Sequence, residues 1–427
     1  MNTLRLFSLL LACILLSSTA CYASSAENTL VIGAGANREE FKNFSQATGI
    51  KIEVAESRDM MDTISTAYAI QDDRVDIYVF TAYQGLYLIK EKEFYVPMNE
   101  SEGLMAEFDK LYAPLQRALM DGENVVGWFL NVQPITMENS HVLKEWQLPM
   151  PETFSEFLDT CKYIYGNELL EDKYTMMYVG DYIQEDILEL YMQWYISANY
   201  IQGTVPDFTS DEFCTMVQRI VDEVPVNSTT LMSDDKGWAF CFHYAKQYIS
   251  TEMLSMPRVL EGQDNAVEAY ATIAVINPFS KNKETAAAFL EYCAQNPDNE
   301  TQRYICDSTM TEPLIHEKNM AQLNAFRLEL EKYKQAETLT QEEKDRMAQL
   351  EESLIPEYES KCYWIDEEDI AYYQEFAQNL LVNEGSPVSY DAQLQQYASQ
   401  YLSGLMTLEQ FSQKCQSHIE RIFKELQ

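Results

Sequence analysis

The stretch ATIAVINPFSKNKETAAAFLEYCAQ, residues 271–295, combines three local signals in a fixed order. Its first six residues are rich in Ile, Val and Ala, which favours a buried strand. Asn277-Pro278 ends that strand, because proline has no N–H to donate to a sheet ladder. Ser280 and Asn282 offer side-chain oxygens that can cap a helix, and apolar residues then recur at helical spacing. The stretch therefore predicts a strand, a tight turn and a docked helix.

The size and charge of the chain limit the possible architectures and partners. Its 427 residues exceed one ordinary hydrophobic core, so two lobes or domains are expected. With 46% hydrophobic and 23% charged residues the chain is globular rather than disordered. The formal net charge of -38 argues against nucleic acid as a partner, because phosphate contacts need clustered Lys and Arg. Only 14 glycines favour a helix-rich α/β protein over a phosphate-loop enzyme.

The first residues have the layout of a secretion signal. Arg5 supplies the positive end, and residues 6–16 form an apolar run that is shorter than the roughly 20 residues needed to span a bilayer. Small residues, SSTA, then lead into Cys21. We therefore expect residues 1–20 to be a signal peptide.

Ser18-Thr19-Ala20-Cys21 resembles a lipobox. In lipoproteins the cysteine of this motif carries a diacylglyceryl group and becomes the first mature residue, so the resemblance implies lipidation at Cys21. Ser18 stands where the motif usually has an aliphatic residue. Cleavage after Ala20, Ala23 or Ala26 to release a soluble protein therefore stays open.

The remaining cysteines do not form an obvious disulfide framework. Seven follow Cys21, an odd number that excludes complete internal pairing, and no C-x-x-C occurs. Most lie among apolar neighbours at helical spacing, where a free thiol behaves as a small hydrophobe. For an exported protein this indicates a weakly oxidising or anaerobic habitat, with one or two disulfides left open. The seven are Cys161, Cys214, Cys241, Cys293, Cys306, Cys362 and Cys415.

The first part of the mature chain alternates strand and helix patterns. Apolar strands are predicted at 29–33, 50–54 and 75–80, with a helix capped by Asn37 and a second helix at 59–70 between them. This order implies an open parallel sheet. Ligands of such sheets bind outside the carboxyl ends of the strands, which places a site at Gly33–Asn37 and Phe80–Gln84.

Later residues are predicted to be mainly helical. Helical periodicity covers 183–201 and 209–222, a strand lies within 228–249, and Thr340-x-x-Glu343 caps the second arm of a helical hairpin at 317–354. Asp366 opens another helix, and Thr407-x-x-Gln410 caps the last one.

Seven segments, taken in order, resemble the extracellular solute-binding proteins that feed ATP-driven (ABC) importers, the sugar-binding-like family 1. They are TLVIGAG (29–35), F-x-x-x-T-G-I-K-I-E-V (44–54), DIYV (76–79), LMDGENVVGWFLNV (119–132), LPMPETFSEFL (148–158), the stretch at 271–295 and YLSGLMTLEQF (401–411). Phe154 stands where the family usually has Trp. The resemblance spans nearly the whole mature chain, and the order of the segments is more specific than any one of them.

The resemblance implies a two-lobed, periplasmic-binding-protein-like (type II) α/β fold. Each lobe is expected to be an open, mostly parallel sheet flanked by helices, with a helix-rich second lobe. Residues 27–133 and 256–308 are assigned to the first lobe, and residues 134–255 and 309–427, including the hairpin, to the second.

No sequence pattern favours catalysis, and we expect no enzyme, cofactor or metal site. Gly33-Ala-Gly35-Ala-Asn37-Arg38 starts like a dinucleotide fingerprint but has Arg38 where the third glycine belongs. His316-Glu317 is followed by Met320 instead of a second histidine, so no zinc motif forms. The four histidines are scattered, which leaves acid–base chemistry little to use.

Aromatic residues are the more informative asset, with 28 Tyr, 19 Phe and 5 Trp. Sugar-binding clefts place flat rings against the apolar faces of a sugar and polar groups against its hydroxyls. The ligand-binding candidates are the aromatic, Asn and Gln residues at predicted strand ends and crossovers: Asn37, Tyr83, Trp128, Asn131, Gln133, Trp238, Phe242 and Tyr244. Tyr191, Trp194 and Tyr195 lie within a predicted helix and are expected in the core.

These observations predict a receptor that closes on a small solute between two lobes and delivers it to the permease subunits of an ABC importer. An oligosaccharide is favoured as the solute, and a peptide or polyamine fits too. The alternative is a co-receptor that presents its solute to a membrane sensor kinase. The protein is expected on the outer face of the cell membrane as a lipoprotein, or secreted or periplasmic if it is not lipidated.

Overall fold

The structure is a computed structural model. It describes residues 29–426, apart from gaps at 58, 140–142, 144, 168, 170–173, 178–182, 203, 227–236, 245–248, 250–252, 255–256, 261, 263–266, 298, 360 and 386–390. The expected signal peptide and Cys21 lie outside the described residues. Within the described part, no helix combines the length and the apolar character needed to cross a bilayer.

The predicted alternation of strands and helices at the start of the chain is confirmed. β1 (Thr29–Ala34), β2 (Lys51–Glu56) and β3 (Ile77–Thr81) are parallel and lie in the order β2-β1-β3. Their crossovers are α2 (Glu39–Thr48), which ends at Gly49 with a positive φ of 75°, and α3 (Met60–Ile70). The carboxyl ends of β1 and β3 therefore meet at one edge of the sheet.

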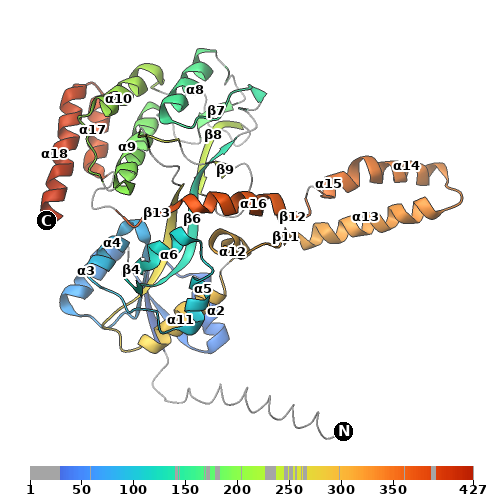
Figure 1. Cartoon of the computed structure of the whole chain (residues 1–427), viewed down its shortest axis with the longest axis horizontal. Coiled ribbons are helices and arrows are strands. Elements are labelled where there is room, and N and C mark those ends of the chain that lie inside the picture. The colour runs from blue at the N-terminus through green and yellow to red at the C-terminus, as the bar shows by residue number, and fades with distance from the viewer. Residues whose placement is uncertain are drawn as a thin grey trace, which may run out of the picture.

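Two long strands carry the sheet from one half of the molecule to the other (Figure 1). β10 (Val267–Ile276) pairs antiparallel with β3 on one side and with β6 (Trp128–Asn139) on the other. β6 then pairs with β8 (Gly237–Tyr244), which pairs with β7 (Tyr174–Met177). The short strands β13 (Leu380–Val382) and β9 (Met253–Leu254) join β10 and β6. The sheet is therefore mixed. Its parallel parts are β2-β1-β3, the β10–β13 pair and the β7–β8 pair, and its other pairs are antiparallel.

In the turn after β10, Ser280 and Asn282 do not cap the following helix as predicted. α11 (Lys283–Gln295) begins at Asn282, but no side chain caps it. The Ser280 hydroxyl instead donates to Oδ1 of buried Asp76 (2.6 Å), and the Asn277 amide donates to the carbonyl oxygens of Asp72 (2.8 Å) and Val75 (2.6 Å). These polar side chains fasten the turn to β3, because a buried polar group is retained only where it is hydrogen-bonded.

A first core surrounds β1, β2 and β3. It contains buried residues from 30–132, from 267–305 and from 365–382, together with Ile249. Its helices and short strands are η1 (Ala82–Gln84), α4 (Leu86–Glu91), α5 (Glu102–Phe108), α6 (Ala113–Leu119), β4 (Met120–Asp121), β5 (Asn124–Val125), α12 (Glu300–Cys306), α16 (Glu367–Phe376) and η3 (Ala377–Asn379).

The first core includes a segment from the last part of the chain. The sequence division places all of 309–427 in the second lobe, whereas Ile365–Val382 pack into the first core. The physical reason is that β13 pairs with β10 and that the Tyr373 hydroxyl donates to the carbonyl of Ile305 (3.2 Å).

A second core is built from helices. α8 (Phe154–Gly166), α9 (Ile183–Ile201), α10 (Asp211–Glu223), α17 (Ala392–Leu402) and α18 (Leu408–Leu426) contribute its buried residues. Rings of Phe154, Tyr191, Phe213 and Phe411 form a continuous series of contacts at its centre. Tyr191, Trp194 and Tyr195 are buried as expected.

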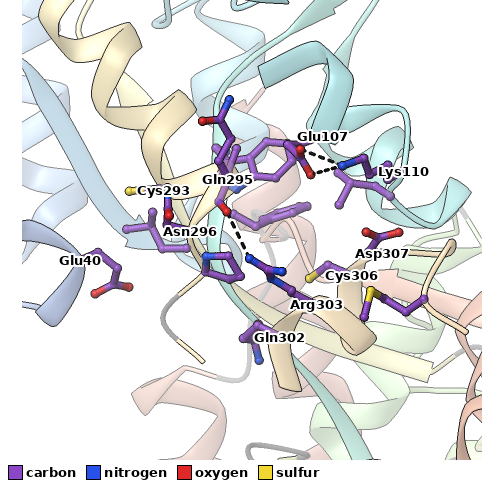
Figure 2. A pocket seen from close by; sticks show the side chains of 17 residues that line it. Glu40, Glu107, Lys110, Cys293, Gln295, Asn296, Gln302, Arg303, Cys306 and Asp307 are labelled. Carbon is purple, nitrogen blue, oxygen red and sulfur yellow. Dashed lines mark hydrogen bonds and ion pairs between the residues drawn. The ribbon is translucent and has the colours of Figure 1, made fainter. Parts of the chain in front are cut away.

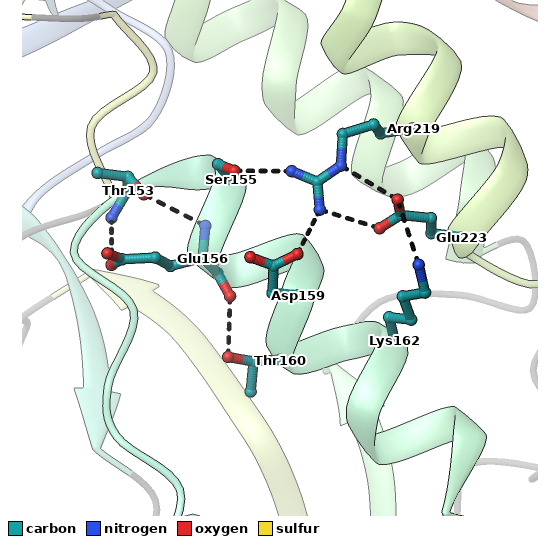
Figure 3. A network of polar contacts seen from close by, with 8 residues as sticks. All are labelled: Thr153, Ser155, Glu156, Asp159, Thr160, Lys162, Arg219 and Glu223. Carbon is teal, nitrogen blue, oxygen red and sulfur yellow. Dashed lines mark hydrogen bonds and ion pairs between the residues drawn. The ribbon is translucent and has the colours of Figure 1, made fainter.

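Ionic contacts fix α10 against α8 at the rim of the second core (Figure 3). The Arg219 guanidinium donates to Ser155, to Asp159 and to Glu223 at distances of 2.6–3.2 Å. The first turn of α8 is closed by a capping box in which Thr153 and Glu156 satisfy each other's backbone N–H groups.

The helices predicted at 317–354 are present and project from the rest of the molecule (Figure 1). α13 (Glu317–Gln335) runs out, and α14 (Gln341–Gln349), the π-helical η2 (Leu350–Leu354) and α15 (Ile355–Glu359) run back. Thr340 and Glu343 form the predicted capping box. The base is closed by β11 (Leu314–Ile315) pairing with β12 (Tyr363–Ile365).

Candidate functional site

A hollow with a volume of about 260 Å³ lies where β3 ends against β10 and β6. Its described lining residues are Thr81, Tyr83, Asn131, Gln133, Tyr270, Ala271 and Thr272. Three of them, Tyr83, Asn131 and Gln133, are residues that the sequence singled out for ligand binding. The hollow thus lies at the carboxyl end of a parallel strand, where ligands of open α/β sheets bind.

Tyr83 is placed by the turn that follows β3. The Thr81 side chain accepts from the backbone N–H of Gln84, and the Gln84 side chain accepts from the Thr81 N–H (3.2 Å), which closes a capping box around η1. The Tyr83 ring is 44% exposed and lies with its centroid 5.1 Å from that of Tyr270, at an interplanar angle of 41°. The two rings therefore present a shared aromatic surface at the edge of the hollow.

The polar lining comes from facing positions on β6 and β10. Asn131 pairs with Thr272 and Gln133 with Tyr270, while the intervening Val132 is fully buried on the other face. A β-bulge between Thr272 and Ile273 shifts the register next to this lining. Bulges of this kind re-aim side chains beside functional sites.

The backbone between Asn131 and Gln133 is hydrogen-bonded to buried Gln302 of α12. Its Oε1 accepts from the Val132 N–H (2.8 Å), and its Nε2 donates to the Val132 carbonyl (3.1 Å). The side chain of Gln302 thus satisfies both backbone groups of Val132, as a neighbouring strand would. This contact supports the backbone of β6 between Asn131 and Gln133.

The described lining of the hollow contains amides, hydroxyls and aromatic rings, and no Asp, Glu, Lys, Arg or His. Such a surface offers hydrogen-bond donors and acceptors without the desolvation cost of a charge. Its chemistry fits a neutral ligand that carries many hydroxyl groups.

Trp128 lies elsewhere, at the start of β6. It is 6% exposed and lines a separate pocket of about 170 Å³ between α11, α12 and the start of β6, shown in Figure 2. At the rim Lys110 pairs with Glu107 (2.8 Å), and Arg303 donates to the carbonyl of Gln295 (3.4 Å). The structure therefore does not bring Trp128 together with Tyr83.

Two cysteines line this second pocket, Cys293 and Cys306. Burial raises the pKa of both thiols, to about 12 for Cys306. A protonated thiol is a poor nucleophile, so neither residue is suited to covalent catalysis.

Asn37 is exposed beyond β1 and does not line the hollow. Its Oδ1 accepts from the N–H of Arg38 (3.0 Å), and Arg38 is the residue that precedes α2. The predicted helix cap at Asn37 is therefore wrong by one residue.

Trp238, Phe242 and Tyr244 belong to β8, as the predicted strand implies. In the backbone register Tyr244 faces Ile135, two residues beyond Gln133 along β6. The side chains of Trp238, Phe242 and Tyr244 are not among those that the structure describes. β6 therefore continues from the hollow, where it pairs with β10, into the part of the sheet where it pairs with β8.

Sequence reasoning missed Thr81, Tyr270 and Thr272. A usable signal was present, because Tyr270 and Thr272 alternate with buried Ala269, Ala271 and Ile273 along β10. Polar and aromatic residues at every second position of a strand share one face. The pairing of β10 with β6, which sets them opposite Asn131 and Gln133, was not visible in the sequence.

Solved structures with this fold include two binding proteins at low sequence identity. One is an ABC transporter solute-binding protein from Agrobacterium vitis S4 with bound D-mannitol, with 14% identity, a TM-score of 0.52, and 93% of this chain and 99% of that chain covered. The other is from Agrobacterium radiobacter K84 in complex with ribitol, with 12% identity, a TM-score of 0.51, and 92% and 98% covered. The predicted periplasmic-binding-protein-like fold is confirmed.

The comparison with curated protein sequences gave no match. The family model described as bacterial extracellular solute-binding protein matches residues 39–309. This range includes β3, β6 and the whole of β10, and therefore every described residue of the hollow. The chain belongs to the bacterial extracellular solute-binding protein family.

Proposed function

We propose that this protein captures a neutral polyhydroxylated solute, a sugar or a sugar alcohol, and delivers it to an ABC-type importer. The observation that carries the proposal is the hollow in which the Tyr83–Tyr270 ring pair lies beside Asn131, Gln133 and Thr272. Rings pack against the C–H faces of a sugar, and amide and hydroxyl groups exchange hydrogen bonds with its hydroxyls.

The chemistry of the lining favours a sugar over the other two solutes considered from the sequence, a peptide and a polyamine. A polyamine or a peptide with several charges needs a set of ionised partners, one for each charge, and the described lining of the hollow has none. The two solved neighbours are described with bound D-mannitol and ribitol. They support adding sugar alcohols to the oligosaccharide that the sequence favours as the solute.

Capture would use both lobes. The first lobe would comprise the first core with Ile365–Val382, and the second lobe the helical second core, with β6 and β10 running between them. A solute that contacts both lobes selects the closed arrangement by its differential affinity. A lipid on Cys21 would hold the receptor at the membrane beside the permease subunits.

Thermal unfolding of the mature protein against a panel of solutes tests the proposal. The panel contains D-mannitol, ribitol, maltose, a tripeptide and spermidine. A ligand at about 100 times its dissociation constant adds roughly 2.7 kcal/mol to the unfolding free energy, a shift of several degrees. We expect the shift from a sugar or sugar alcohol. A shift from spermidine or the peptide alone would contradict the proposal.

A further inference from the structure

Glu268 is an acidic side chain next to the proposed solute site that does not belong to the described lining of the hollow. It lies on β10 two residues before Tyr270 and four before Thr272, and the three share the face opposite buried Val267, Ala269 and Ala271. Two residues of a strand span about 7 Å. A solute that fills the hollow and extends along β10 toward the second lobe therefore reaches Glu268.

Among the residues that the structure describes, the Glu268 carboxylate accepts a hydrogen bond from Asn383. Nδ2 of Asn383 donates to its Oε1 at 2.5 Å. The orientation of the Asn383 amide is set independently, because its Oδ1 accepts from the backbone N–H of Gly385 (2.9 Å). Since the oxygen of the amide is occupied by an N–H donor, the NH₂ group must point toward the carboxylate.

The same segment touches the aromatic edge of the hollow. Gly385 has a φ of 85°, and a Cβ at this position would collide with the carbonyl oxygen of Tyr83. Only glycine accepts both the positive φ and the close approach. Contacts thus run from Tyr83 through Gly385 and Asn383 to Glu268, and back along β10 to Tyr270, whose ring meets that of Tyr83.

Glu268 lacks a counter-charge among the described residues. Lys90, the cation of the neighbouring ion pair, is bound to Glu384 at 2.6 Å. Burial raises the pKa of Glu268, and the hydrogen bond from the neutral Asn383 amide acts in the opposite direction. A partly buried carboxylate with one described neutral donor retains capacity to accept further hydrogen bonds. Acids whose pKa is shifted by burial cluster at functional sites.

We propose that Glu268 is a specificity-determining residue that accepts hydrogen bonds from hydroxyl or ammonium groups of the bound solute and rejects solutes that carry a carboxylate. The substrate class is then neutral or amino-substituted sugars and sugar alcohols, with sugar acids excluded. This inference rests on the proposed function, because it assumes that the hollow holds the solute. Rejection arises because two carboxylates placed side by side in a partly buried site repel each other strongly.

Three probes with the same carbon chain test the inference: D-glucitol, which is neutral, D-glucamine, which is cationic, and D-gluconate, which is anionic. Their affinities for the mature protein are measured by titration calorimetry at pH 7.5. We expect D-gluconate to bind at least about tenfold more weakly than D-glucitol. In Glu268→Gln, which keeps the shape and the Asn383 contact, that preference falls to about threefold or less.

Glu53→Gln is the matched control. It removes the same charge from an exposed position on β2 of the same sheet, so the preference against D-gluconate stays as in the parent. Equal preferences in the parent and Glu268→Gln would overturn the inference and leave the proposed function standing. If none of the three probes bound the parent, both the proposed function for this solute class and the inference would fall.

Discussion

α13 and α18 are both 19-residue helices, but they are stabilised in opposite ways. α18 buries Phe411, Cys415 and Ile419 in the second core. Among its residues α13 buries only Leu323, and its Leu328 is 68% exposed. The contacts of α13 are chiefly with α14, η2 and α15 of its own hairpin. The comparison teaches that equal helix length does not imply an equal role in the stability of the protein.

The largest expected effect is on the α18 side of this comparison. Phe411 is fully buried, and its ring stacks on Tyr401 at 5.0 Å and faces Phe213 at 6.4 Å. Phe411→Ala removes these contacts and leaves a cavity, so we expect the unfolding free energy to fall by about 3–5 kcal/mol. Urea denaturation followed by circular dichroism measures the loss. A loss below about 1 kcal/mol would mean that α18 is not part of the core.

An intermediate effect is expected at Asp186 in α9. Burial, followed by repulsion from Glu189 and Glu185, raises its pKa to about 6. Between the ordinary value of 3.8 and about 6 the folded state holds a proton that the unfolded state has lost, so this group destabilises the fold as pH rises. Asp186→Asn removes that cost, and we expect a gain of about 1 kcal/mol at pH 7.5 after discounting for solvent screening.

The gain from Asp186→Asn should shrink toward zero as the pH falls below the ordinary value of 3.8, to about 3, where the carboxyl of the parent is protonated in both states. Paired urea titrations at the two pH values measure it. Asp222→Asn, an exposed acid on neighbouring α10, is the control and should change little at either pH. A gain that is equal at both pH values would contradict the titration of Asp186.

The smallest effect is expected from removing the hairpin. Its ends already meet, because the His316 N–H donates to the carbonyl of Cys362 (2.7 Å) and Ile315 faces Tyr363. Replacing residues 317–361 with an Asn-Gly turn should therefore close β11 onto β12 without strain.

We expect the shortened protein to unfold within about 0.5 kcal/mol of the parent and to bind solute with the same affinity. Thermal unfolding and calorimetry measure the two quantities. Loss of folding would show that the hairpin shares the main core. Loss of binding with folding intact would show that it supports the solute site.

Much of the fold could be predicted because its signals are local. The strand–turn–helix at 271–295, the cap at Asp366 and the capping box at Thr340 each depend on residues within a few positions of one another. The placement of Ile365–Val382 could not be predicted, because it depends on β13 pairing with a strand more than a hundred residues earlier.

The candidate site divides along the same line. Tyr83 follows directly from its place after a parallel strand, and Asn131 and Gln133 from the crossover motif. Tyr270 was missed because it lies far away in the sequence. Only the pairing of β10 with β6 shows that Tyr270 lies opposite Gln133. Trp128 illustrates the opposite case, because a large ring near a predicted crossover lies in the core as readily as in a site.

The most direct test of the proposed solute site is calorimetric titration of Tyr270→Ala with the sugar or sugar alcohol that stabilises the parent. Tyr163→Ala, which removes a 51% exposed ring from α8, is the matched control. We expect Tyr270→Ala to weaken binding by about tenfold or more, since loss of an aromatic contact costs roughly 1–2 kcal/mol, and the control to bind as the parent does. Unchanged affinity in Tyr270→Ala, with the fold intact, would contradict the assignment of the hollow as the solute site.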